Sequence, residues 1–171
     1  MVDRIVVFVA EGFGSGWIRP GPGTWGSLVG LAWLVLLLRA SHPAVWALGT
    51  FAGLALAVPL CGRAETVLNV RDPGSVVLDE IAAVPLLWLG VLLTPGGYVF
   101  SGAVSSLAIL MAHFPELAAG LVAFRVLDIA KPGPIRRVQR LPRGVGIVAD
   151  DVLAGLGAAM VAGAVAWMRW S

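Results

Sequence analysis

Long apolar runs dominate the chain, and the polar positions gather in the segments between them. The apolar stretches are Leu28–Leu38, Pro43–Leu60, Ile81–Leu93, Tyr98–Phe124 and Val152–Met168. A helix that crosses a bilayer needs about 20 residues, although about 17 can suffice. The pattern therefore predicts an all-α fold, a polytopic membrane bundle of about five helices, some short or kinked, in a single domain over residues 1–171.

Short links and prolines refine this prediction. The links at residues 39–42 and 94–97 are too short to cross a membrane, so we expect two helical hairpins, one around each link. Pro59 and Pro85 are expected to kink or end the helices that contain them, because proline lacks the amide hydrogen.

The composition agrees with a membrane protein. The chain is 58% hydrophobic and 13% charged, whereas a soluble domain is about 45–50% apolar and about 25% charged. The single cysteine, Cys61, excludes an internal disulfide, and two histidines make a histidine-built zinc site unfavourable. A net charge of +2 is too small to indicate a nucleic-acid partner.

The charged residues are distributed unevenly between the two predicted sides. With five spans, the amino-terminal segment and the loops at 61–80 and 125–151 lie on the same side. Ten of the twelve basic residues and nine of the ten acidic residues fall there. The positive-inside rule makes this side cytoplasmic, and we expect several of its loops to form one site.

A glycine- and proline-rich segment, residues 14–27, is predicted to be irregular. Its backbone amides could form an anion site, as could the amino end of the helix that follows. The predicted phosphate-binding residues in this segment are Arg19, Thr24 and Ser27. The alternative is an interfacial turn in which Ser27 caps the first helix and Trp17 and Trp25 anchor it at the headgroups.

Carboxylates stand at three predicted membrane boundaries: Asp79, Glu80, Asp128, Asp150 and Asp151. One acid at a helix start is a common cap, and this is the expected role of either Asp150 or Asp151 alone. Adjacent acids repel each other unless a cation lies near them. Oxygen ligands without histidine or cysteine suit Mg²⁺, so the sequence predicts a magnesium site built from all five carboxylates.

Basic residues accompany Asp128. Arg125 and Lys131 each lie three positions from it, so all three share a helix face and form candidate salt bridges. Both cations, together with Arg19, are candidates to bind phosphate oxygens. Pro132 is expected to end that helix. The basic residues that follow predict a surface patch attracted to anionic lipid: Arg136, Arg137, Arg140 and Arg143.

The usual phosphoryl nucleophiles are not found. Cys61 lacks the arginine that a C-x5-R loop requires, Ser15 does not fit G-x-S-x-G, and the two histidines lie in unsuitable places. Metal-assisted attack remains, by water or by a carboxylate. The candidate catalytic residues are Asp79, Asp128, Asp150 and Lys131.

Four blocks in this order resemble the phosphatidylglycerophosphatase A family: PGTWGS (22–27), SVVLDE (75–80), FRVLDIAKPGPI (124–135) and GVGIVADDVLAG (144–155). The resemblance implies an Mg²⁺-dependent, multi-pass enzyme of the bacterial inner membrane. Such an enzyme hydrolyses phosphatidylglycerophosphate to phosphatidylglycerol and inorganic phosphate. The family's acidic pattern falls on the five carboxylates named above, with Thr24, Arg125 and Lys131 beside them. Gly133 and Ala83 depart from the residues common in the family at those positions.

Two other functions fit the same residues. The first is another membrane enzyme of phosphorylated lipids, such as a transferase that uses the same metal. The second is a small transporter or a non-catalytic scaffold, although transport acids usually lie at mid-membrane. Here Glu116 alone approaches such a position, and we assign it no function.

Overall fold

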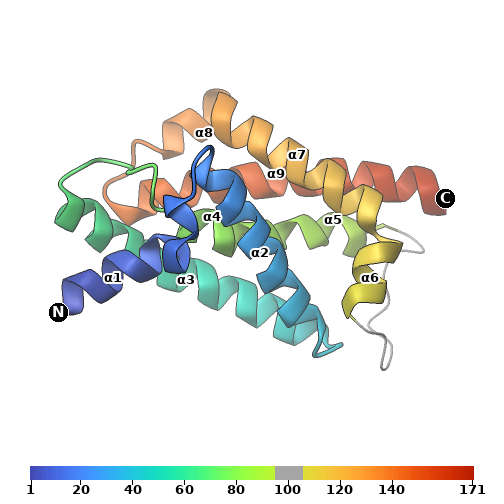
Figure 1. Ribbon diagram of the computed structural model, residues 1–171. Helices are drawn as coiled ribbons and strands as arrows, with labels where there is room; N and C mark the ends of the chain where they lie inside the picture. Colours follow the sequence, from blue (N-terminus) through green and yellow to red (C-terminus); the bar gives the residue numbers. More distant parts are fainter. Residues whose placement is uncertain (95–105) are drawn as a thin grey trace.

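The computed structural model describes residues 1–94 and 106–171 (Figure 1), and the elements in this part of the chain are helical, which confirms the all-α prediction. In chain order they are α1 (Val2–Ala10), η1 (Gly12–Trp17), α2 (Pro22–Leu38), α3 (Pro43–Leu68), α4 (Leu78–Ala83), η2 (Val84–Leu87), α5 (Trp88–Leu92), α6 (Ser106–Ala112), α7 (Phe114–Ala130), α8 (Gly133–Val138) and α9 (Gly144–Trp170).

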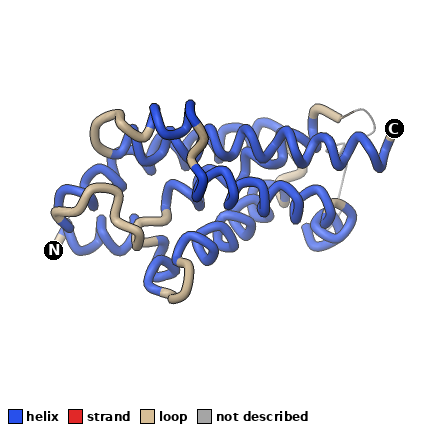
Figure 2. Tube along the Cα trace, turned by 90° about the horizontal axis from the view of Figure 1, so that it is seen from above, coloured by secondary structure: helices blue, strands red, loops and turns tan. Residues whose placement is uncertain are grey.

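The longer helices run lengthwise through the molecule in two opposite directions. In Figures 1 and 2, α2, α9 and the row formed by α4, η2 and α5 run one way, whereas α3 and α7 run back. The first turns of α2, α4 and α9 therefore lie at the same end as the last turns of α3 and α7. The short helices α1 and α8 lie at this end too.

Two helices in the described part of the chain, α3 and α9, are long and apolar enough to cross a membrane. This supports membrane association by length and composition, but it is fewer than the five spanning helices that the apolar pattern predicted. Large apolar side chains on α3 are exposed, for example Leu48 at 70% and Phe51 at 69%. Such a surface suits contact with lipid.

The three remaining apolar stretches form shorter helices for local reasons. Pro85 divides the third stretch into α4, η2 and α5, as expected for a residue that lacks an amide hydrogen. The fourth stretch is described from residue 106, where α6 and α7 are separated at His113, while residues 98–105 and most of the second link lie outside the described residues. The first stretch is part of the 17-residue α2.

The expectation that all of residues 14–27 are irregular was wrong in part. The segment PGTWGS is not irregular: Pro22 occupies the first turn of α2, where its missing amide hydrogen costs nothing. The helix therefore starts six residues before the apolar run. Pro59 does not end α3, which continues to Leu68. The predicted hairpin around residues 39–42 is confirmed, because α2 ends at Leu38 and α3 begins at Pro43.

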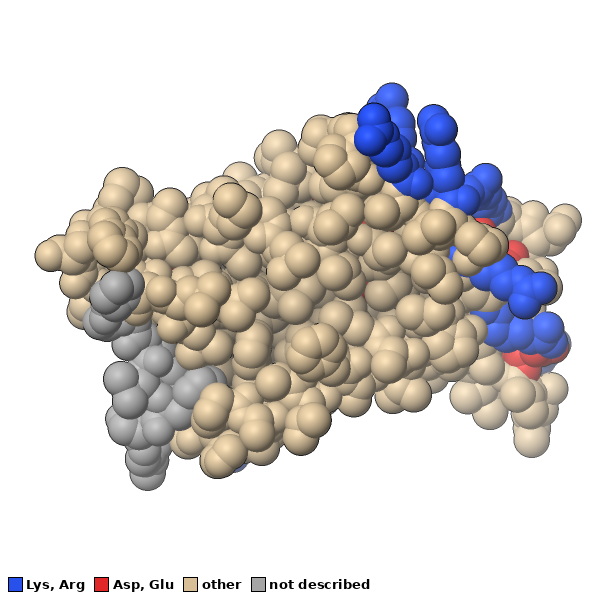
Figure 3. Space-filling view, turned by 180° about the vertical axis from the view of Figure 1, so that it is seen from behind, with Lys and Arg blue, Asp and Glu red and all other residues tan. Residues whose placement is uncertain are grey.

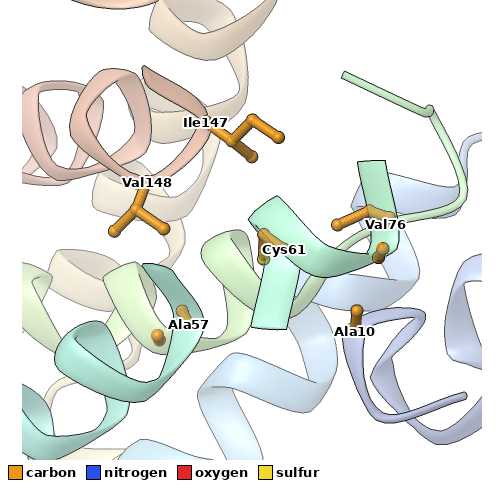
Figure 4. Close-up of a cluster of buried hydrophobic side chains, with 8 residues drawn as sticks. Ala10, Ala57, Cys61, Val76, Ile147 and Val148 are labelled. Carbon is orange, nitrogen blue, oxygen red and sulfur yellow. The ribbon is translucent and has the colours of Figure 1, made fainter. Parts of the chain in front are cut away.

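Small residues let α9 pack closely in the centre. Its buried positions include Ala154, Ala158, Ala162 and Ala166, and it contacts α7, α3 and α5. Near the amino end of α9, Val148 meets Ala57 and Cys61 of α3 in the cluster of Figure 4. Small side chains at such contacts allow helix backbones to approach each other closely. The packing fixes the amino end of α9, which carries two carboxylates.

Candidate functional site

A pocket of about 320 Å³ opens at the end of the molecule where the starts of α2, α4 and α9 meet the end of α7. Figure 3 shows this end as the place where basic and acidic side chains gather on the face in view. The charged residues that line the pocket are Asp72, Asp79, Glu80, Arg125, Asp128, Lys131, Asp150 and Asp151. Segments far apart in the sequence thus converge, as the sequence predicted.

The two aspartates of α9 do not cap that helix. The helix begins at Gly144, so Asp150 and Asp151 lie well inside it, and they are 3% and 2% exposed. The expectation that one of them is a cap was therefore wrong. Gly144 explains the early start: a Cβ there would overlap the Val58 carbonyl oxygen, so only glycine lets α9 begin this close to α3.

The surroundings of Asp150 and Asp151 differ because the side chains of consecutive helix residues point about 100° apart. Lys131 Nζ donates a hydrogen bond to Asp150 Oδ2. In contrast, Asp151 Oδ2 is buried without a hydrogen-bond partner among the residues that the structure describes.

The end of α7 supplies two cations and a carboxylate on one face. This confirms the prediction that these residues, spaced three positions apart, share a helix face. Arg125 Nη1 lies 2.9 Å from Asp128 Oδ2, and Lys131 Nζ lies 3.9 Å from Asp128 Oδ1. The helix ends at Ala130, as Pro132 predicted, and Lys131 has a left-handed φ of 43°. Asp128 is thus flanked by both cations.

Asp79 and Glu80 form the first turn of α4 and are buried. Arg125 Nη1 donates to Glu80 Oε1 at 2.8 Å, but Asp79 Oδ1 and Glu80 Oε2 have no hydrogen-bond partner in the described part of the chain. Burial raises the pKa of Glu80 to about 7 even though Arg125 opposes this effect. Burial, and then the Glu80 charge, raises the pKa of Asp79 well above its ordinary value.

The first turn of α2 covers the Glu80–Arg125 pair. A Cβ at Gly23 would overlap Glu80 Oε1 and would lie 2.6 Å from Arg125 Nη1. Gly23 therefore lets the backbone of α2 approach this ion pair closely, and an added methyl group would have to displace the ends of the two side chains. Gly21 and Pro22 line the pocket beside it.

Three of the predicted phosphate-binding residues do not line the pocket. Arg19 and Thr24 are exposed on the outer surface. Ser27 is buried within α2, where its hydroxyl donates to the Gly23 carbonyl oxygen at 2.8 Å. Ser27 is therefore neither the expected cap of the first helix nor a donor into the pocket. Arg125 and Lys131 are the predicted phosphate ligands that the structure brings to the site.

One pocket residue, Asp72, was not among the site residues predicted from the sequence. Its carboxylate lies 3.7 Å from Lys131 Nζ and accepts a hydrogen bond from Gln139 Nε2 at 2.8 Å. It belongs to the Asp-Pro-Gly turn after α3 and has a positive φ of 48°. The signal in the sequence was that of a turn, and nothing local indicated that the turn faces the end of α7.

The charge balance of the pocket favours a bound cation. Six carboxylates and two basic residues line it, which gives a formal net charge of −4 when all are ionised. Oxygen atoms of Asp128, Asp150 and Asp151 lie within 4.8 Å of one another. Together with the unpartnered oxygens of Asp79 and Glu80, they form an all-oxygen donor set of the kind that Mg²⁺ prefers. The residues therefore fit the metal that the sequence predicted.

The fold and the pocket define a class: a helical protein with two helices long and apolar enough to cross a membrane, and with an acidic pocket that also contains two basic residues. The sequence model of the family described as "Phosphatidylglycerophosphatase A" matches residues 8–166, which include every pocket residue. The chain belongs to this family.

Relatives named "Phosphatidylglycerophosphatase A" are similar over most of the chain. The Haemophilus influenzae protein is 36% identical, covering 94% of this chain and 88% of its own. The Escherichia coli protein is 32% identical, covering 86% of this chain and 76% of its own. A Bacteroides thetaiotaomicron protein named "Putative phosphatidylinositol-3-phosphatase" is 31% identical, covering 88% and 86%. No solved structure matches the chain.

Proposed function

We propose that the protein is an Mg²⁺-dependent phosphatase that converts phosphatidylglycerophosphate into phosphatidylglycerol and inorganic phosphate at the cytoplasmic face of the bacterial inner membrane. Family membership supports phosphatidylglycerophosphatase activity. The observation that carries the proposal is the set of buried, unpartnered carboxylate oxygens of Asp79, Glu80 and Asp151 around one pocket. Uncompensated buried charge is costly, so these oxygens are suited to a bound cation.

A bound metal would reconcile the net negative pocket with an anionic substrate. A phosphomonoester carries up to two negative charges and would be repelled by six carboxylates facing two cations. In the proposed site, Asp128, Asp150 and Asp151 hold Mg²⁺, with Asp79 and Glu80 completing the acidic wall. The bound ion supplies charge neutralisation at the phosphoryl group and lowers the barrier to attack.

Arg125 and Lys131 are the proposed phosphate ligands of the chain itself. Each already bridges carboxylates from two elements: Arg125 joins Glu80 to Asp128, and Lys131 joins Asp128 to Asp150. These contacts hold both cations at the pocket, where they can bind phosphoryl oxygens. In the net reaction a water oxygen forms a bond to phosphorus, and the bond from phosphorus to the glycerol oxygen breaks, leaving phosphatidylglycerol and phosphate.

The geometry of α9 suits a lipid substrate. Residues 152–170, which follow the two aspartates, extend about 28 Å at 1.5 Å per residue, close to the thickness of a hydrocarbon core. The carboxylates would then lie at the membrane boundary, and the acyl chains of the substrate could remain in lipid. The basic residues around this end favour the cytoplasmic side.

Phosphate release from phosphatidylglycerophosphate tests the proposal, with purified protein in detergent, with and without Mg²⁺. We expect release with Mg²⁺ and its loss when the metal is chelated. Asp79→Asn and Asp151→Asn should each reduce turnover by about a hundredfold or more, whereas Asp3→Asn, an exposed carboxylate paired with Arg63, should not. Normal turnover in both pocket variants would exclude the acidic site and would favour a scaffold or transporter.

A different phospholipid monophosphate is the second candidate substrate. The Bacteroides relative, whose name refers to a phosphatidylinositol phosphate, favours this alternative. The assay should therefore compare phosphatidylglycerophosphate, phosphatidic acid and phosphatidylinositol 3-phosphate. We expect the highest kcat/KM for phosphatidylglycerophosphate. A lipid product without free phosphate would instead favour a transferase.

A further inference from the structure

Two adjoining cavities lie between the second half of α3 and the segment that leads into α9. The larger, about 800 Å³, runs between α3 and the start of α9 and is lined by Val58, Pro59 and Val145. The smaller, about 460 Å³, continues beyond α3 and contains Arg71 and Arg140. Pro142 and Arg143 line both, so the two cavities adjoin each other and are together called the groove. Neither shares a residue with the pocket of the six carboxylates.

The groove is mainly apolar in the larger cavity and basic in the smaller one. The larger cavity exposes mainly apolar surface of α3 and of the first turn of α9, although Arg63, which is paired with Asp3, and Arg143 also line it. In the smaller cavity three arginines face a single acid, Glu65, and Glu65 Oε1 accepts a hydrogen bond from the Asp72 amide at 3.3 Å. Within the described residues, no ion pair joins Arg140 or Arg143 to a carboxylate. These cations are available to an anionic ligand.

We propose that this groove is a binding site for a second lipid, an anionic diacyl phospholipid of the surrounding membrane. One acyl chain lies along Val58 and Pro59 of α3, and the phosphate binds to Arg140 and Arg143. The groove has apolar surface beside basic residues, just as a phospholipid has acyl chains beside an anionic headgroup. Its basic end lies at the charged end of the molecule, where headgroups belong (Figure 3). The site does not depend on the reaction in the pocket.

Arg71 lies in the groove and is linked through Gln139 to the pocket, so the test leaves it unchanged. It lines the groove, but its guanidinium also donates to the Gln139 carbonyl oxygen at 3.4 Å, and Gln139 binds Asp72 of the pocket. Changing Arg71 would therefore affect both sites. Arg140 and Arg143 have no such contact with the residues of the pocket, and Arg136 and Arg137 of α8 are exposed arginines outside both cavities.

Direct lipid binding by the full chain in detergent tests the proposal, measured by native mass spectrometry with phosphatidylglycerol and phosphatidylcholine of identical acyl chains. We expect the wild-type chain to retain phosphatidylglycerol at least about tenfold better than phosphatidylcholine. The double variant Arg140→Gln/Arg143→Gln should lose about tenfold or more in phosphatidylglycerol affinity, because each basic residue near a headgroup contributes about fivefold.

The matched control is Arg136→Gln/Arg137→Gln, which removes the same charge from the neighbouring surface and should change phosphatidylglycerol affinity less than about twofold. Equal losses in both double variants would overturn the proposal in favour of a diffuse basic patch. No preference over phosphatidylcholine, or displacement of the lipid by inorganic phosphate alone, would overturn it too. Phosphate release from phosphatidylglycerophosphate, measured on the same preparations, fails independently if the proposed reaction is wrong.

Discussion

Gly23 shows how one backbone position can control the site. A methyl group there would overlap Glu80 Oε1 and press on Arg125, so Gly23→Ala should displace this pair and reduce phosphate release by about tenfold or more. The variant should still fold, because alanine favours a helix by about 1 kcal/mol over glycine. Gly74→Ala is the matched control: it changes a glycine of the same pocket that has nothing within 4 Å of an added Cβ. Equal activity of the two variants would contradict this reading.

Substitutions at Lys131 and Ser27 test which of the predicted phosphate-binding residues contact the substrate. Lys131 lies among three carboxylates of the pocket, so Lys131→Gln should lower kcat/KM by about a hundredfold. Ser27→Ala loses a hydrogen bond inside α2, and Arg19→Gln changes an exposed residue outside the lining. Both should keep kcat/KM within about threefold of the wild-type value. If Arg19→Gln raises KM as much as Lys131→Gln does, the residues before α2 must reach the substrate.

At the scale of the helices, an ion pair between Glu116 and Arg169 joins α7 to α9 at the end opposite the pocket. Glu116 is 0% exposed, and both of its oxygens lie 2.7 Å from Arg169 Nη1. Arg169→Gln should destabilise the folded chain by about 2 kcal/mol or more, because it leaves a buried carboxylate without its cation. Thermal unfolding in detergent measures this loss. Glu116→Gln combined with Arg169→Gln should recover part of it, and no recovery would show that the two residues act separately.

The sequence predicted the convergence of the carboxylates because each acid stands beside an apolar run, and helix ends on one side of a bundle meet. It did not predict where the helices begin. Glycine normally disfavours a helix, yet Gly23 and Gly144 lie in first turns because a neighbouring chain segment passes close to each. Asp72 was missed for a related reason: its contacts with Lys131 and Gln139 join residues more than 55 positions apart. Such contacts leave no local pattern.

At the scale of the whole molecule, the charged end contains the pocket, the groove, the start of α9 and the end of α3. If α9 crosses the membrane with its first turns in the cytoplasm, Gly133 at the start of α8 must lie inside the cell and Ser171 after α9 outside. Single cysteines test this in a Cys61→Ala background, since Cys61 is buried and does not report topology. Gly133 is exposed with open space around it, which suits a label.

Intact cells treated with a membrane-impermeant maleimide should label Ser171→Cys, whereas Gly133→Cys should react only after the inner membrane is opened. The positive-inside rule gives this direction, because the arginines of α8 and of the turn before α9 flank Gly133 on the same side. The Cys61→Ala chain alone should remain unlabelled in both conditions. The reverse pattern would place the pocket outside, away from a lipid phosphate presented by the inner leaflet. Labelling of both positions only after opening would mean that α9 does not cross the membrane, and the pocket would then require a different route to its lipid.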